Sequence, residues 1–310
     1  MIDYDFIISL LNSMLRMSIP LIFAATGEII AEKSGVINIG LEGQMLLGAF
    51  VSLCVSYETG SVLIGVLAAG LLAALSTLPV YYIGVVRRQN QSVVGIMLNI
   101  FIIGFTSFFY RVFYGVSLTP PSLKTLPSLS IPILNRIPVL GETIFNQTWL
   151  AYTGIIVTVI IWFILKHTVL GIKLKAVGEN PRAAQAAGIS VLKTRLLSLM
   201  STGFLAGLGG AFLTVAYAGR FSDGITSGRG YIALAIVIFG RWNPVVAMGG
   251  ALLFGLVDAF QLRAQTIGFD LPYQFFVMMP YLVVLLSIFF TGKNATSPAA
   301  LGQPFEKEGR

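Results

Sequence analysis

Few residue types in this sequence suit catalysis. The only histidine, His167, follows Lys166 at the end of an apolar run, and the only cysteine is Cys54. The sequence has no H-E-x-x-H motif, no histidine inside an apolar run that could activate a nucleophile, and no G-x-x-x-x-G-K phosphate-binding loop. One cysteine cannot form an internal disulfide and is too few for a metal cluster. We therefore expect no enzyme, no metal site and no cofactor bound by this chain.

The residues that could bind a solute are polar side chains inside otherwise apolar stretches. Residues 32–49 read EKSGVINIGLEGQMLLGA, where Asn38, Glu42 and Gln44 stand among glycines and apolar side chains, and Asn99 lies inside a long apolar run. An acid at membrane depth is costly and usually functional, and irregular backbone is tolerated there only inside protein or beside a watery cavity. These four residues are therefore candidates for lining a translocation path.

The same residues also have purely structural interpretations. Glu42 would stand in the first turn of a helix that begins near Leu41, where the helix dipole favours an acid. Asn38 could complete a turn, and Asn99 could form a hydrogen bond between helices. The sequence leaves both interpretations open.

The overall composition decides the class of protein. Of the 310 residues, 56% are hydrophobic and 11% are charged, whereas a soluble domain carries about 25% charged residues. Soluble enzymes, disordered regulators and nucleic-acid binders all need more polar surface. The net charge of +7 must then be interpreted by where the basic residues lie in the chain, because basic residues mark the cytoplasmic loops of membrane proteins. The composition indicates an integral membrane protein in contact with lipid and not with nucleic acid.

Apolar runs predict an all-α, polytopic fold. A spanning helix needs about 20 mainly apolar residues. We expect about 8–10 transmembrane helices, broken or re-entrant segments included, in one domain at residues 1–292, followed by a polar cytoplasmic tail at 293–310. The long runs lie at about 6–31, 61–86, 92–114, 149–166, 193–218, 244–262 and 271–291, and shorter, glycine-punctuated runs lie at about 41–57 and 227–240.

Two broken segments stand in matching places. Residues 224–240 read GITSGRGYIALAIVIFG and, like residues 32–49, have a glycine-rich start before a short apolar run. Interrupted segments in matching places point to a substrate path between repeats. We therefore predict two pseudo-repeated halves, although no residue-by-residue repeat is evident.

Basic residues set the orientation. The densest basic stretch lies at about 166–195, and Arg87 and Arg88 flank another short connection, so both should lie in the cytoplasm. The proline-rich connection at about 115–148 then lies outside. The N-terminus lies outside if residues 41–57 span fully, which we favour, and inside if they re-enter. The basic residues of the long stretch are Lys166, Lys173, Lys175, Arg182, Lys193 and Arg195.

Further residues suggest how helices pack. Small residues four apart let helices approach closely in lipid, and Asp258 could pair with Arg263 near a helix end. Arg111 should reach the outer surface. The small-residue positions are Gly203, Gly207, Ala206 and Gly210 in one run, and Ala247, Ala251 and Gly255 in another.

The cytoplasmic stretch 176–190, AVGENPRAAQAAGIS, predicts a short helix. Asn180 is a good N-cap, Pro181 suits the first helical position, and Gly188 is a natural stop. About two turns are too few to span a membrane. The helix could dock into a groove on a soluble partner, or it could be a capped surface loop without a partner.

This stretch resembles the coupling helix of bacterial ABC importer permeases, which carries a Glu-Ala-Ala-x-x-x-Gly pattern. Here Arg182, Ala183, Ala184 and Gly188 occupy its positions, with arginine in place of glutamate. The strings EKSGVINIGLEGQMLLGA, GENPRAAQAAGI and GRGYIALAIVIFGRWNP follow in order. Over about residues 20–290 the chain is similar to permease subunits of the branch that takes up simple sugars, branched-chain amino acids and nucleosides, and it looks most like the nucleoside importers.

The resemblance implies a multi-pass protein of the bacterial inner membrane, without ATPase activity of its own. Residues 180–188 would insert into an ATPase subunit. The implied partners are two ATPase subunits, or one with two nucleotide-binding domains, a second related permease in a heterodimer or homodimer, and an extracellular substrate-binding protein. ATP and Mg would be used by the ATPases. The implied substrate is a small neutral solute, a nucleoside above all.

Two alternatives stay open. A monosaccharide such as ribose would fit a neutral path equally well. A stand-alone, ion-coupled transporter would share the broken helices, but the helical cytoplasmic loop and the scarcity of ionisable groups argue against it.

Overall fold

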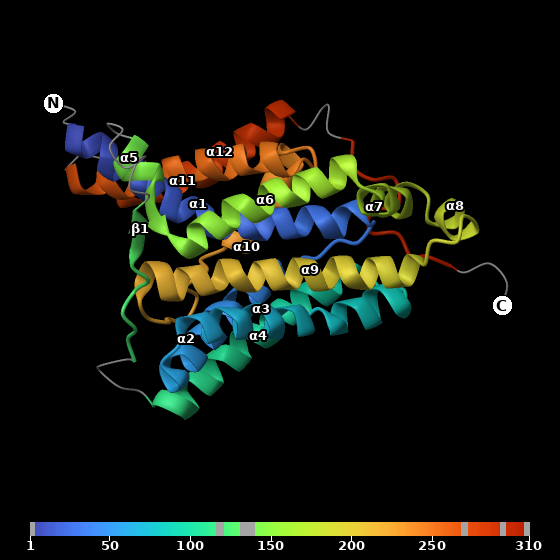
Figure 1. Cartoon of the computed structure of the whole chain (residues 1–310), viewed down its shortest axis with the longest axis horizontal. Helices are drawn as coiled ribbons and strands as arrows, with labels where there is room; N and C mark the ends of the chain where they lie inside the picture. The colour runs from blue at the N-terminus through green and yellow to red at the C-terminus, as the bar shows by residue number, and fades with distance from the viewer. Residues whose placement is uncertain (1–3, 116–120, 131–139, 268–271, 292–295, 307–310) are drawn as a thin grey trace.

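The computed structural model describes residues 4–115, 121–130, 140–267, 272–291 and 296–306. They form a bundle whose long helices run roughly along one axis (Figure 1). In chain order the elements are α1 Tyr4–Lys33, α2 Leu41–Thr59, α3 Val62–Leu75, the π-helical η1 Val80–Val86, α4 Gln91–Tyr114, β1 Ser128–Ser130, α5 Leu140–Ile144, β2 Asn146–Thr148, α6 Trp149–His167, α7 Val169–Glu179, α8 Pro181–Ala186, α9 Val191–Ala211, the π-helical η3 Phe212–Ala218, α10 Arg229–Phe239, α11 Pro244–Ile267 and α12 Tyr273–Thr291.

The all-α, polytopic prediction is confirmed. Within the described residues, six helices are long and apolar enough to cross a membrane, and two shorter apolar helices accompany them. The strands found there are β1 and β2, an antiparallel pair of three residues each with Ser128 opposite Thr148. This pair lies in the connection predicted at 115–148. The six spans are Phe6–Lys33, Val62–Val86, Gln91–Tyr114, Trp149–His167, Val191–Ala218 and Pro244–Gln265.

The two ends of the bundle differ in what they carry. At one end lie the start of α1, α5 and β1, and at the other lie α7, α8 and the C-terminal residues (Figure 1). We call these the β1 end and the α8 end. The N-terminal end of α1 therefore shares an end with the long connection, although α2 is not among the six spans. Residues 41–57 fall within the continuous helix α2.

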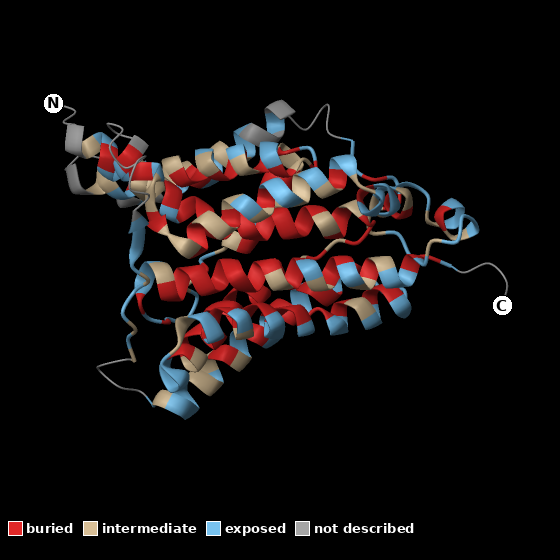
Figure 2. Cartoon of the chain, in the orientation of Figure 1, coloured by how far each residue is buried: buried red, intermediate tan, exposed pale blue. Residues whose placement is uncertain are grey.

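Small residues bring α9 into the centre of the bundle, as expected. In its first half, α9 is buried along one face, and from Thr202 to Ala211 it is buried almost completely (Figure 2). A side chain at Gly203 or Gly207 would meet the backbone of α3, and one at Gly210 would meet the Met45 carbonyl of α2. Without a hydrophobic drive between helices in lipid, such close backbone contact is what holds the bundle together. In contrast, apolar side chains on the outer faces of α3 and α4 are exposed, as lipid contact requires.

Replacing Gly210 tests this packing. Gly210→Val should destabilise the protein by about 1–3 kcal/mol, because the Met45 backbone cannot move aside without displacing α2. Thermal unfolding in detergent measures the effect. Gly104→Val is the matched control, since a Cβ at Gly104 meets nothing within 4 Å. Equal unfolding temperatures for the two variants would contradict the assigned packing.

Candidate functional site

Two helices begin inside the bundle with their N-termini together. α2 begins at Leu41 after the non-helical residues 36–40, and α10 begins at Arg229 after the loop 219–228. A Cβ at Gly230 would clash with the backbone of Glu42, so only glycine allows this approach. Each helix N-terminus carries a partial positive charge and several unpaired N–H groups. The junction therefore needs an anionic acceptor.

Glu42 supplies that acceptor. Its Oε1 accepts hydrogen bonds from Thr226 Oγ1 at 2.6 Å and from the Gly228 N–H at 2.9 Å, and its Oε2 accepts from the Gly230 N–H at 2.6 Å. The side chain stands in the first turn of α2 while it caps α10, and the residue is only 7% exposed. Charge-assisted bonds of this kind are the stronger ones. One carboxylate thus serves two helix N-termini.

Asn99 joins α4 to the same junction. Its Oδ1 accepts from the Gly43 N–H at 2.7 Å, and its Nδ2 donates to the Ile39 carbonyl at 2.8 Å and to the Tyr231 hydroxyl at 3.0 Å. Both polar atoms of the buried amide are therefore used within the protein. Tyr231 itself is 47% exposed and presents its ring at the surface beside this network.

Asn38 and Gln44 form a closed amide pair. Asn38 Nδ2 donates to Gln44 Oε1 at 2.8 Å, Gln44 Nε2 returns a longer bond of 3.3 Å, and both residues are fully buried. The Asn38 N–H donates to Glu28 Oε1, and the Ile37 N–H to Gln91 Oε1, each at 2.9 Å. The irregular backbone before α2 is thus hydrogen-bonded by side chains, as membrane depth requires.

The four path candidates therefore meet at one place. Asn38, Glu42, Gln44 and Asn99 all belong to a polar network around the start of α2, which we call the half-helix junction. In this conformation each of them is buried and bonded to protein groups, with Glu42 in the first turn of α2 and Asn99 bonded between helices, as the structural interpretation of those two residues has it. Their contact with a solute stays a prediction.

Two buried acids of α1, Glu28 and Glu32, were not among the residues predicted to line the path. Glu28 and Glu32 are 0% and 5% exposed, and Glu32 accepts a short hydrogen bond from the Trp242 indole N–H. They stand four residues apart near the end of the first apolar run. An acid inside or beside an apolar run is a usable signal for both residues, and Glu32 is also the first residue of the glycine-punctuated stretch 32–49.

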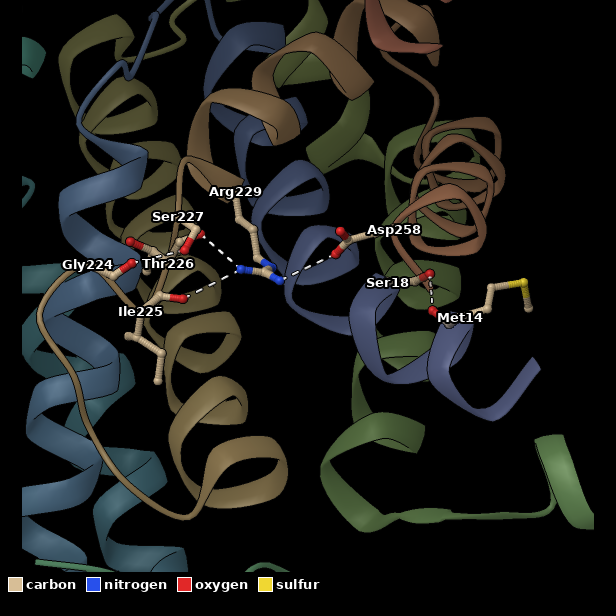
Figure 3. A network of polar contacts seen from close by, with 8 residues as sticks. All are labelled: Met14, Ser18, Gly224, Ile225, Thr226, Ser227, Arg229 and Asp258. Carbon is tan, nitrogen blue, oxygen red and sulfur yellow. Dashed lines mark hydrogen bonds and ion pairs between the residues drawn. The ribbon is translucent and has the colours of Figure 1, made fainter. Parts of the chain in front are cut away.

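The expected pairing of Asp258 with Arg263 is wrong. Asp258 Oδ2 instead pairs with Arg229 Nη2 at 3.5 Å, with side chains 18% and 16% exposed (Figure 3). Residues five apart on a helix do not share a face, whereas those three or four apart do. Arg263 bonds to Ser9 and Ser13 of α1.

The ion pair offsets an unfavourable positive charge at the start of α10. Arg229 is a cation at a positively charged helix N-terminus, which is unfavourable by itself. The Asp258 carboxylate offsets that charge, and the guanidinium also donates to the Thr226 carbonyl at 3.3 Å (Figure 3). The pair thereby fixes the start of α10 against α11, next to the Glu42 cap. Arg111, expected at the outer surface, is exposed and pairs with Asp223 at 3.0 Å.

The predicted short helix is present at the α8 end. The Asn180 side chain accepts from the Ala183 N–H at 3.0 Å, Pro181 is the first residue of α8, and Gly188 has φ +82°, which favours glycine. Arg182 and Ala183 are exposed, while Ala184 is buried against the protein. α8 projects from the bundle at this end (Figure 1).

In the described part of the chain, no three His, Cys, Asp or Glu side chains lie close enough to hold a metal ion.

Changing Glu42 tests the junction. In Glu42→Gln, one oxygen becomes an NH₂ group that faces an N–H donor, so at least one buried donor loses its acceptor. We expect the free energy of unfolding to fall by about 1–3 kcal/mol, measured by thermal unfolding in detergent. Glu58→Gln is the control, because Glu58 is an exposed acid on the same helix. Identical behaviour of the two variants would exclude the capping role.

Comparison with known proteins agrees with this architecture. The family model described as "Branched-chain amino acid transport system / permease component" matches residues 10–288. The guanosine ABC transporter permease protein NupQ of Bacillus subtilis is 36% identical over 299 residues, 93% of each chain. The nucleoside ABC transporter permease protein NupC of Lactococcus lactis is 35% identical over 309 residues, covering 95% of this chain and 96% of NupC.

Two further relatives extend the comparison. The putative glucose ABC transporter permease protein TsgC13 of Haloferax volcanii is 35% identical over 272 residues, 86% of this chain and 81% of the relative. A second guanosine permease protein of B. subtilis, NupP, is 29% identical over 253 residues, 78% of this chain and 71% of the relative. No solved structure matches significantly. The chain belongs to the permease-component family of the branched-chain amino acid transport system, and it is a multi-pass membrane permease of the ABC importer type.

Proposed function

We propose that this chain is one of two permease subunits of an ABC importer for nucleosides in a bacterial inner membrane. The observation that carries the mechanism is α8, a capped helix that projects from one end of a chain without a phosphate-binding loop. Two ATPase subunits, or one with two nucleotide-binding domains, would bind ATP and Mg and dock at α8. The choice of nucleosides rests on NupQ and NupC.

The orientation follows from charge. The α8 end carries the basic residues of α7, α8 and the start of α9, so it faces the cytoplasm under the positive-inside rule. The β1 end then faces outwards and would receive solute from an extracellular binding protein. The occurrence of NupP beside NupQ in one organism favours a second, related permease as partner, and a homodimer is the alternative.

The half-helix junction would form part of the path. The wall of the path would be held in position by Asn38, Glu42, Gln44 and Asn99. The exposed ring of Tyr231, which Asn99 holds by a hydrogen bond, would face the solute. An aromatic ring with a polar edge suits an uncharged, aromatic solute such as a nucleoside.

Two other functions have an observation in their favour. The similarity to TsgC13, named for glucose, favours a monosaccharide. The buried Glu28, whose Oε2 has no partner among the described residues, favours ion coupling.

A reconstituted system separates these functions. The permease pair, the ATPases and the binding protein would be placed in lipid vesicles, and uptake of labelled guanosine, ribose, glucose and leucine compared. We expect guanosine uptake that needs ATP. Uptake of sugar alone would show that the substrate is a sugar and not a nucleoside. Guanosine uptake by the permease under an ion gradient, without ATPase, would overturn the importer mechanism.

Gly188 allows a test of the coupling helix. Gly188→Arg should abolish ATP-dependent uptake while the protein still assembles in the membrane, because a long, charged side chain next to α8 obstructs docking. Gly188→Asn is the matched control, since asparagine tolerates the same backbone conformation with a small side chain. Vesicle uptake and ATPase co-purification measure the effect, and normal uptake by Gly188→Arg would refute the role of the loop.

A further inference from the structure

The last described residues, 296–306, pack against the bundle. The Ala300 N–H donates to the Gly178 carbonyl at 2.8 Å, which ties this segment to the end of α7. The Gly302 N–H donates to the Gly35 carbonyl at 3.1 Å, which ties it to the corner after α1. We call residues 296–306 the C-terminal strap.

Arg195 fixes the strap from inside. Although it was expected in a basic cytoplasmic loop, the residue is fully buried at the start of α9. Its Nε donates to the Ser34 carbonyl at 3.2 Å, and its Nη1 donates to the Gln303 carbonyl at 3.3 Å. A buried guanidinium is tolerated only with such acceptors. The same side chain therefore holds the strap and the corner after α1 together.

Phe305 joins the strap to α8. It is 7% exposed and packs in a small apolar cluster with Val177, Ala184 and Val191, separate from the main core. Ala184 is the buried residue of α8. The side of α8 that faces the protein thus rests on the strap.

The strap also shapes the surface beside α8. Glu306 pairs with Arg88 of the turn between η1 and α4 at 3.0 Å. A hollow of about 440 Å³ lies between residues 179–182 and residues 299–306. A second hollow of about 280 Å³ is lined by Arg182, Gln185, Ala186 and Glu306. The outward surface at this end is therefore built from α8 and the strap together.

We propose that the ATPase subunit docks on this composite surface, α8 with residues 303–306, and that the strap transmits its displacement to the half-helix junction. This inference rests on the proposed function. The route runs from Phe305 under α8, through Gln303 and Gly302 to the corner at Ser34 and Gly35, and along residues 36–40 to Glu42. α8 itself, about two turns long, packs against α7, α9 and Phe305 of the strap.

Photocrosslinking tests the docking surface. A photoreactive amino acid would be placed singly at Pro304 of the strap, at Ala186 of α8, and at Tyr57 near the β1 end, all exposed positions. In the assembled, reconstituted complex, the first two should crosslink to the ATPase and the third should not. Crosslinking from Ala186 without crosslinking from Pro304 would overturn the composite surface.

Detaching the strap tests transmission. Phe305→Asp should leave a monodisperse protein, because its cluster is separate from the main core, but lower ATP-dependent guanosine uptake at least tenfold and uncouple ATP hydrolysis from substrate. Phe305→Leu should restore most uptake. Ser297→Ala is the matched control in the strap, because Ser297 is exposed and lies outside residues 303–306.

The outcomes distinguish the strap from the importer itself. Absence of ATP-dependent uptake by the unaltered complex would refute the proposed function. Normal uptake by the unaltered complex together with normal, coupled uptake by Phe305→Asp would refute the strap alone.

Discussion

The carboxylate of Glu42 holds two helices whose N-termini would otherwise repel each other. α2 and α10 begin among packed helices, so the free N–H groups at each start need protein acceptors. Glu42 bonds the Gly228 and Gly230 N–H groups and stands in the first turn of α2. The surrounding amides of Asn38, Gln44 and Asn99 satisfy the irregular backbone that this arrangement creates. The other contacts of the junction depend on this one placement.

The helices around the junction pack closely. The glycines of α9 let its backbone contact α2 and α3, and Asp258 holds Arg229 at the start of α10. A displacement of residues 36–40 would therefore be felt by α2, α4 and α10 together, since Asn99 contacts the Ile39 carbonyl, the Gly43 N–H and Tyr231. Packed elements with few alternative arrangements pass on a displacement rather than absorb it.

Local signals made much of the fold predictable. Apolar runs located the long helices, and Asn180, Pro181 and Gly188 located α8, because capping depends on neighbours in the chain. The sequence also identified the polar residues of the junction, but not their partners. Glu42 bonds residues more than 180 positions away, and Arg195 bonds Gln303 across 108 positions. Such pairs depend on how helices pack, which periodicity does not encode. The wrong pairing of Asp258 with Arg263 had a local cause, because residues five apart on a helix do not share a face.

The few charged side chains at membrane depth bear on how transport is energised. An ion-coupled transporter needs acids that bind and release an ion during each cycle. Here Glu42 is held by three donors, Asp258 by Arg229 and Glu32 by Trp242, so an ion that bound these acids would compete with contacts that fix the helices. Glu28, with one free oxygen among the described residues, is the exception. In the proposed importer, an input at the α8 end would avoid this cost, because a push on α8 and the strap would move the junction while its carboxylates keep their partners.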